Sequence, residues 1–124
     1  MGLPDVAALR VRFERDPELA HSVRFWTGAL YFQAGSARSA LRFENGRLAD
    51  AGPSAALTGP RDVEISAEPG EWAKLLAPLP APFYQDVFGA ALHHPVSLGG
   101  DVETLYAYYP AIRRVLEILR EARV

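Results

Sequence analysis

The dipeptide Asn45-Gly46 restricts the fold of this 124-residue chain more than any other short feature of its sequence. Asparagine and glycine tolerate the positive φ angles that the two central residues of a tight β-hairpin require. Apolar and polar residues alternate before this pair, so Leu41 and Phe43 share one face of an extended chain. The sequence therefore predicts two antiparallel strands, over residues 39–44 and 47–50.

Three more strands are predicted from composition and alternation. Residues 26–33 are mostly aromatic and aliphatic and precede a glycine-containing turn, so this segment and the hairpin form a three-stranded meander. Val63 and Ile65 alternate with polar residues in a fourth strand. Val96 and Leu98 alternate in a short fifth strand, which follows a proline.

Helices are predicted at the start of the chain and after the fourth strand. Residues 4–24 form a helical segment that is interrupted in the middle, with Pro4 in its first turn. Asp16 and Pro17 restart the helix, as its cap and its first residue. A further helix begins at Pro69.

Two more helices are predicted in the second half of the chain. The spacing of Phe83, Val87 and Phe88 fits one face of a short helix. Residues 101–123 carry apolar side chains three and four positions apart, which is typical of an amphipathic helix. Pro110 either kinks this helix or begins a second one. Together, the helices are expected to cover one face of a single sheet.

Composition limits the class of protein. The chain has no cysteine, which excludes disulfides, thiolate nucleophiles and zinc sites with sulfur ligands. A formal net charge of -2, with arginines interleaved among acidic residues, gives no basic face for nucleic acid. No apolar run approaches the roughly 18 residues of a membrane span, and no signal-peptide pattern opens the sequence. We expect one cytoplasmic domain over residues 1–124, with a helical segment over 1–21, no stable membrane insertion, and the arginine-rich usage of a bacterial gene.

Gly99, Gly100 and Asp101 raise the alternative of a phosphate-binding loop. Such a loop normally carries a lysine that reaches the phosphates, and the one lysine of this chain is Lys74. An aspartate at the start of a helix would repel phosphate, but it would cap the free N–H groups of the first turn. We interpret the three residues as a turn and a helix cap.

No catalytic constellation emerges from the sequence. The serines lack the context of a nucleophile elbow, and the acidic pair Asp62 and Glu64 fits the solvent-facing side of a strand. His93 and His94 are adjacent and lack the spacing of a metal site, and His21 stands alone. We predict no catalytic residue, no metal ligand and no cofactor.

The order of these segments resembles the sterol carrier protein type-two domain, over about residues 22–120. The corresponding segments are the strand from Asp62 to Ile65, the helix with Trp72 and Leu75-Leu76, and the strand end Leu98-Gly99-Gly100-Asp101 before the last helix. The hairpin LRFENGRL is similar to the strand, turn and strand of that family. The linear order carries the resemblance, rather than any single motif.

The resemblance implies an α+β fold, in which several helices cover one face of a five-stranded, mostly antiparallel sheet. It also implies an apolar tunnel between sheet and helices that holds a fatty acid, an acyl-CoA or a sterol-like lipid. By position, the residues expected to line the tunnel are Leu41, Phe43, Val63, Ile65, Trp72, Leu76, Phe83, Phe88, Leu105, Tyr109, Ile112 and Leu116. The chain departs from the family at His94-Pro95, where a glycine is usual, and at Pro110, and both departures affect the mouth of the tunnel.

The sequence favours a non-enzymatic carrier of an apolar or amphipathic small molecule. A second interpretation is a structural or protein-interaction domain with a filled core, as a homodimer or as an accessory to an enzyme. Tyr106 and Tyr108 are expected to form an exposed patch for such a contact. A third is an enzyme that acts on a lipid-like substrate, for which the sequence offers no nucleophile and base.

Overall fold

The computed structural model describes residues 5–54 and 59–123, so Pro4, expected in the first helical turn, lies outside the described residues. The helices are α1 (Arg10–Glu14), α2 (Pro17–Ser22), α3 (Pro69–Leu75), α4 (Val87–His93), α5 (Val102–Ala107) and α6 (Tyr109–Arg123). The strands are β1 (Gly28–Ala34), β2 (Ala37–Glu44), β3 (Arg47–Pro53), β4 (Val63–Ala67) and β5 (Val96–Gly100). Their order along the chain is the predicted one.

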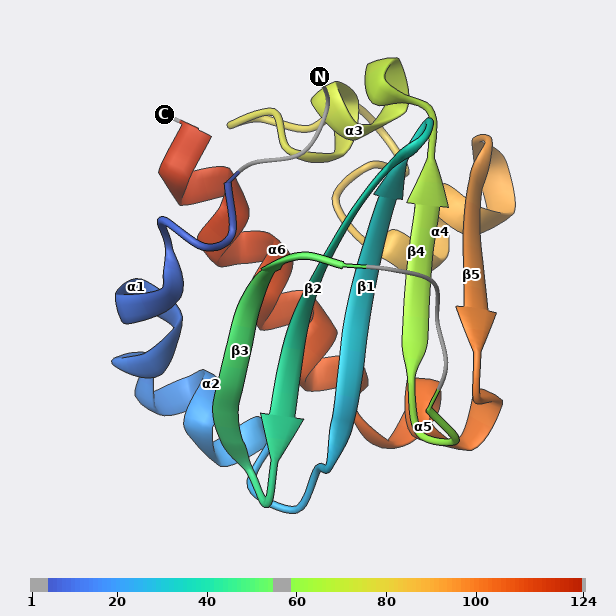
Figure 1. Cartoon of the computed structure of the whole chain (residues 1–124). Helices are drawn as coiled ribbons and strands as arrows, with labels where there is room; N and C mark the ends of the chain where they lie inside the picture. Colours follow the sequence, from blue (N-terminus) through green and yellow to red (C-terminus); the bar gives the residue numbers. More distant parts are fainter. Residues whose placement is uncertain (1–4, 55–58, 124) are drawn as a thin grey trace.

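The strands of the described residues form one sheet in the order β3-β2-β1-β4-β5 (Figure 1). β1, β2 and β3 form the predicted antiparallel meander, and β4 pairs antiparallel with β5. The pairing of β1 with β4 is parallel, with Leu30 opposite Val63 and Phe32 opposite Ile65. The sheet is therefore mixed, and the prediction of a five-stranded, mostly antiparallel sheet is confirmed.

The predicted hairpin turn joins β2 to β3. Asn45 and Gly46 have φ angles of 49° and 79°, as this turn requires. The N–H of Gly46 donates to the carbonyl of Trp26 at 2.9 Å, which fastens the turn to the segment that follows α2. β3 continues to Pro53, beyond the predicted end at residue 50. A proline is tolerated there because β3 is an edge strand.

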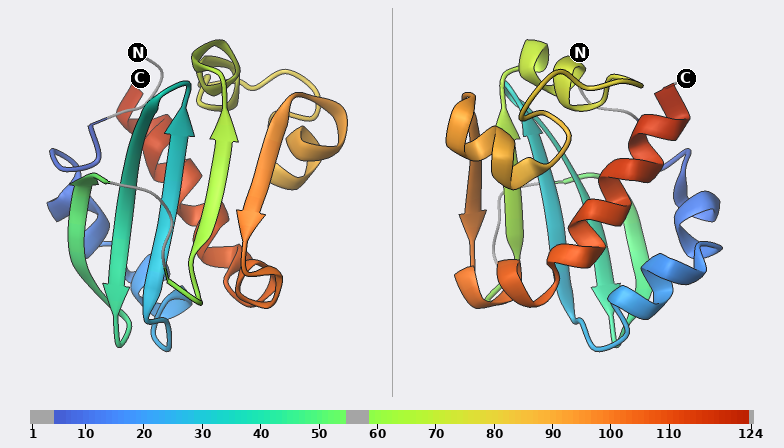
Figure 2. Two further views of the ribbon diagram at one scale, coloured as in Figure 1. Left: turned by 45° about the vertical axis from the view of Figure 1, so that its right-hand side comes forward. Right: turned by 180° about the vertical axis from the view of Figure 1, so that it is seen from behind.

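The helices lie on one face of the sheet (Figures 1 and 2). α6 runs diagonally behind the strands, α1 and α2 lie toward the β3 edge, and α4 lies toward the β5 edge. The inward side chains of the strands, among them Leu30, Phe32 and Leu41, pack with the apolar faces of the helices in one continuous core. This arrangement follows from the alternation of the strands and the apolar stripe of α6.

Both tryptophans are fully buried in this core. Each indole N–H donates to a backbone carbonyl, at 3.0 Å for Trp26 and 2.8 Å for Trp72. Tyr108 stacks on Trp26 with ring centroids 4.7 Å apart, whereas Tyr106 is exposed. The predicted exposed patch of two tyrosines is therefore wrong for Tyr108, because its ring packs against the core.

The helix junctions follow the sequence predictions. Asp16 caps α2 by accepting a hydrogen bond from the N–H of Leu19 at 2.9 Å. Asp101 caps α5 in the same way, with the N–H of Thr104 at 3.0 Å, which confirms the interpretation as a turn and cap. Pro110 is the second residue of α6, so of the two alternatives it begins a second helix.

The predicted helical face of Phe83, Val87 and Phe88 is wrong for Phe83. α4 begins at Val87, and Phe83 lies outside the helix with a φ of 70°. Phe83 therefore does not share a helical face with Val87 and Phe88. Asp86 caps α4 by accepting a hydrogen bond from the N–H of Phe88 at 3.4 Å, so the helix begins after Phe83, and the apolar spacing alone does not show this start.

Asp62 is buried, so the prediction that it faces solvent beside Glu64 is wrong. Its carboxylate accepts hydrogen bonds from the N–H groups of Ala29, at 2.9 Å, and Gly59, at 2.7 Å. A buried carboxylate is tolerated when such donors satisfy it. Asp62 thereby ties the start of β4 to the start of β1.

Candidate functional site

Most of the residues predicted to line a tunnel lie in the closed part of the core. Nine of the twelve are buried in the main core cluster, namely Leu41, Phe43, Val63, Ile65, Trp72, Leu76, Leu105, Ile112 and Leu116. They come from β2, β4, α3, α5 and α6 and from the residue that follows α3. At these positions the sheet and the helices meet through packed side chains.

The other three lie at the margin of the core. Phe88 and Tyr109 are half-buried and pack against it, with ring centroids 4.4 Å apart. Phe83 is half exposed and stacks on His93 at 3.8 Å. The hydroxyl of Tyr109 is buried and makes no hydrogen bond with a described residue. Such a hydroxyl costs about 1–3 kcal/mol unless a water molecule or another polar atom satisfies it.

A pocket of about 300 Å³ lies between the N-terminal helices and the β2–β3 hairpin. We call it the hairpin groove, and its lining residues are Phe13, Glu14, Leu19, Ala20, Val23, Phe43, Gly46, Arg47 and Leu48. Phe43 also belongs to the predicted tunnel set. Leu116, from the same set, lines a separate pocket of about 30 Å³.

The apolar wall of the hairpin groove depends on the break between α1 and α2. The chain turns at Asp16, so that Phe13 on α1 and Leu19 on α2 both bury their side chains toward the hairpin. Phe43 and Leu48 supply the opposite wall from β2 and β3. One continuous helix would separate the two helical side chains, because residues six apart lie on different faces.

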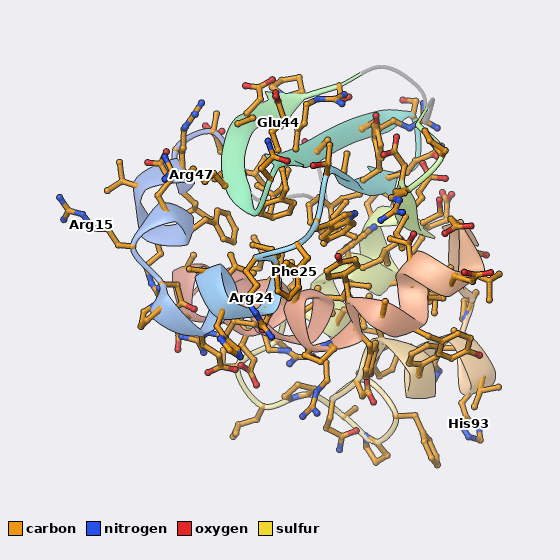
Figure 3. All side chains as sticks on the ribbon, turned by 90° about the horizontal axis from the view of Figure 1, so that it is seen from below. Arg15, Arg24, Phe25, Glu44, Arg47 and His93 are labelled. Atoms are coloured by element: carbon orange, nitrogen blue, oxygen red, sulfur yellow. The ribbon has the colours of Figure 1, made fainter. Side chains whose placement is uncertain are left out.

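The mouth of the hairpin groove carries charge. Glu14 is paired with Arg10 at 3.2 Å, and both side chains are partly exposed. Arg47 is exposed and makes no ion pair with a described residue. Figure 3 shows Arg47 beside the N-terminal helices, with Arg24 and Phe25 near the same end of the molecule. An apolar wall with a cation at its mouth suits an amphipathic molecule with an acidic head.

Asp16 holds the N-terminal helices over the hairpin. Its carboxylate accepts hydrogen bonds from Arg114 on α6, at 2.7 and 2.9 Å, and from Arg12 at 3.0 Å. These bonds, those from Arg114 above all, hold the pKa of Asp16 well below its usual range. On the other side, Arg10 donates to the carbonyl of Ala49 in β3 at 3.1 Å. The groove wall is therefore fixed to both α6 and the sheet.

The histidines of the described residues have packing partners or stand apart. His93 stacks on Phe83 and His94 stacks on Tyr84, each with centroids 3.8 Å apart. Within residues 5–54 and 59–123, no three His, Asp or Glu side chains gather as a metal site. Across the same ranges, every helix is too short or too polar to span a bilayer.

Sequence reasoning found only Phe43 among the groove residues. The resemblance covers about residues 22–120, and Phe13 and Leu19 precede it. A signal was present, because apolar residues continue on both sides of the Asp16-Pro17 break, with the small Ala20 among them. The sequence does not show that this segment folds against the hairpin.

Comparisons with known proteins agree on the fold. No protein-family model and no curated protein matches the chain. A crystal structure of sterol carrier protein 2 matches with a TM-score of 0.67 and 15% identity, over 92% of each chain. UbiJ-SCP2, a ubiquinone synthesis protein, matches with a TM-score of 0.56 and 16% identity, over 90% of this chain and 86% of that one.

A third solved structure extends the comparison to nearly the whole chain. The conserved hypothetical protein TT1886 of Thermus thermophilus, described as possibly a sterol carrier protein, matches with a TM-score of 0.61 and 16% identity. The match covers 98% of this chain and 90% of that one. The sheet order, the helical layer and these three likenesses agree with the fold that the sequence resemblance implied. The chain therefore has the fold of sterol carrier protein 2.

Proposed function

We propose that this protein is a non-enzymatic, cytoplasmic carrier that binds or transfers a hydrophobic small molecule, such as a fatty acid, an acyl-CoA or a sterol-like lipid. The hairpin groove is the observation that carries the proposal, because it combines an apolar wall with an open mouth. The likeness to the sterol carrier protein 2 structure supports the same class of ligand.

The volume of the hairpin groove favours a slender ligand. About 300 Å³ lies at the lower end of the range of about 300–1,000 Å³ for small-molecule pockets. Each CH₂ group of an acyl chain that the groove removes from water contributes about 0.8 kcal/mol. A single acyl chain is therefore the preferred occupant.

Arg47 supports an acidic head group for that occupant. A guanidinium at the mouth can donate two parallel hydrogen bonds to a carboxylate or a phosphate. An exposed pair of this kind contributes only about 0–1 kcal/mol, so the apolar wall supplies most of the affinity. Arg47 then selects among amphipathic ligands and orients them.

The twelve residues predicted from the resemblance define a second location for the same ligand class, between the sheet and the helices. Phe88 and Tyr109, which are half-buried at the margin of the core with ring centroids 4.4 Å apart, support this location. Entry there requires packed side chains to separate. Their role in ligand binding stays a prediction.

A fluorescent long-chain fatty acid titrated into delipidated protein tests the proposal. We expect binding at about micromolar Kd, which corresponds to about 8 kcal/mol. Ala20 is exposed and lines the groove, so Ala20→Trp should fill it and raise Kd tenfold or more. Ala73→Trp, at an exposed position of α3, is the matched control and should leave Kd unchanged.

Two outcomes distinguish a wrong ligand location from a wrong function. Delipidated wild-type protein that binds neither the fatty acid nor a fluorescent sterol contradicts the carrier function. Binding that Ala20→Trp leaves unchanged keeps the function and moves the ligand to the sheet–helix location.

A protein-interaction domain, accessory to an enzyme, is the second candidate. The packed core favours it, because nine of the predicted ligand residues are buried against other side chains of the chain. One structural neighbour is a ubiquinone synthesis protein. Protein that binds no apolar probe, yet sediments in a defined complex with a purified enzyme, would favour this candidate.

A further inference from the structure

Within the part of the chain that the structure describes, β5 is an edge strand without the usual protection against pairing. It is the last strand in the sheet order, and its sequence from Val96 to Gly100 contains neither a charge nor a proline. Exposed edges normally carry charged side chains, prolines or a covering element. A Cβ added at Gly99 would meet no atom within 4 Å. Figure 2 shows β5 at the border of the sheet, with α4 behind it.

The opposite edge of the sheet is protected. The guanidinium of Arg10 donates to the carbonyl oxygens of Ala49 and Leu48, at 3.1 and 3.5 Å. α1 lies beside β3, and the strand ends in Pro53 (Figure 1). The contrast between the two edges indicates that β5 is available for pairing and β3 is not.

Backbone alternation determines which groups of β5 face away from β4. The N–H of Asp101 donates at 2.9 Å to the carbonyl of Asp62, the residue that precedes β4. Every second residue of an antiparallel strand faces the same neighbour, so Ser97 and Gly99 also face β4. Leu98 and Gly100 therefore direct their N–H and C=O groups outward.

The flanks of β5 are complementary to a second copy of the chain. In an antiparallel pairing of β5 with itself, the start of one strand lies beside the end of the other. The residues before the strand include the exposed Leu92 and His93, and those after it include the exposed Val102, Glu103 and Tyr106. Such a pairing brings the exposed apolar side chains of the two flanks to the same end of the interface, and the imidazole of His93 to the end that carries the carboxylate of Glu103.

We propose that two copies of this chain pair antiparallel through β5, centred on Leu98, to form one continuous sheet. The two Leu98 residues exchange both outward hydrogen bonds, and the N–H of each Gly100 donates to the Val96 carbonyl of the other copy. Ser97 of each copy lies directly opposite Gly99 of the other, as a non-hydrogen-bonded pair.

This dimer leaves both hairpin grooves open. His93, next to the start of β5, lies on the side of the molecule away from Arg15 and Arg47 (Figure 3). The hairpin groove lies between α1, α2 and the β2–β3 hairpin, at the β3 side of the sheet. Assembly and ligand binding therefore use different surfaces and can fail independently.

Charge placement across the proposed interface tests both the dimer and its register. Ser97→Lys with Gly99→Lys places like charges directly opposite each other and should raise the dimer Kd tenfold or more in sedimentation equilibrium. Ser97→Lys with Gly99→Glu places opposite charges at the same positions and should leave Kd within about threefold of the wild type. Circular dichroism should show a folded spectrum for both variants, because both positions are exposed. Gly99 lies opposite Glu64 of β4 within the same copy, so the variant with Gly99→Lys should have the higher thermal midpoint of the two.

Cross-linking gives an independent measurement of the register. The chain has no cysteine, so mixed Ser97→Cys and Gly99→Cys chains should form one disulfide-linked heterodimer under mild oxidation. The Cα atoms of such a pair lie about 4.5 Å apart, within disulfide range. A wild-type chain that remains monomeric at about 1 mM overturns the proposal, as does equal association of the two charge variants. Wild-type dimers that resist this cross-link also overturn it.

Discussion

Two buried carboxylates, those of Asp16 and Asp62, connect elements that are distant in sequence. Asp16 caps α2, accepts hydrogen bonds from Arg12 on α1, and pairs with Arg114 on α6. Only 4% of its side chain is exposed, so each lost partner leaves a buried polar group unsatisfied. Asp62 has the same role between β1 and β4.

Asp16→Asn should lower the free energy of unfolding by about 2–4 kcal/mol, because Arg114 loses its buried partner. Asp16 has a lower pKa in the folded chain than in the unfolded chain, where it is about 3.9. The unfolded chain therefore binds the proton more readily, and the stabilisation is present above about pH 4 and is lost as pH falls below it. Urea unfolding at pH 7 and pH 3 should show a smaller difference between the two proteins at pH 3.

The exposed ion pair between Arg12 and Glu121 provides the control. Glu121 accepts a hydrogen bond from Arg12 at 2.8 Å, but 58% of its side chain is exposed. Glu121→Gln should change the free energy of unfolding by less than about 1 kcal/mol. Equal losses from the two substitutions would contradict the role assigned to Asp16.

At the scale of secondary-structure elements, a close backbone contact between Gly100 and Asp62 fixes the junction between β5 and α5. Gly100 has a φ of 94°, and a Cβ there would collide with the carbonyl oxygen of Asp62. This contact brings the end of β5 against the start of β4, where the Asp101 N–H completes the pairing. Glycine is therefore required at position 100 by backbone packing, in the segment whose glycines raised the alternative of a phosphate loop.

Gly100→Ala should lower the free energy of unfolding by at least about 2 kcal/mol, because the new side chain needs both a strained φ and a displaced backbone. Gly99→Ala makes the same chemical change at the adjacent residue, where an added Cβ would meet no atom within 4 Å. It should change stability by less than about 0.5 kcal/mol in either direction. Comparable thermal midpoints for the two variants would refute this account.

Elements with a local signal could be predicted from the sequence. The hairpin turn at Asn45-Gly46, the caps at Asp16 and Asp101 and the start of α6 near Pro110 all depend on residues close in sequence. Phe83 was misassigned because helical spacing does not show where a helix begins, and α4 begins only after its cap at Asp86. Local chemistry fixes where elements begin and leaves their partners undetermined.

Separation of a packed core from an open groove is the main property of the whole molecule. Leu76→Ala removes a fully buried side chain and should cost about 2–5 kcal/mol of unfolding free energy. It should leave the Kd of the fluorescent fatty acid unchanged, because Leu76 is absent from the groove lining. A changed Kd would place the ligand between the sheet and the helices.

The groove could not be predicted because its walls come from distant parts of the chain. Arg114 holds Asp16 from 98 residues away, and Arg10 reaches Ala49 across 39 residues. The sequence shows that Phe13 and Leu19 are apolar, but these long-range bonds determine which surface they face. Nine of the twelve predicted residues are buried, since alternation and helical spacing report burial, and these patterns cannot tell a wall of a cavity from a filled interior.

The crossing of α6 behind the earlier strands has a consequence for how the protein is made. Apolar side chains of residues 109–123 share one core cluster with those of the first strands, so an emerging chain exposes that apolar surface until this helix leaves the ribosome. At about 5–20 residues per second, the delay between β1 and α6 lasts several seconds. Nascent chains therefore keep these apolar side chains exposed to water for that interval.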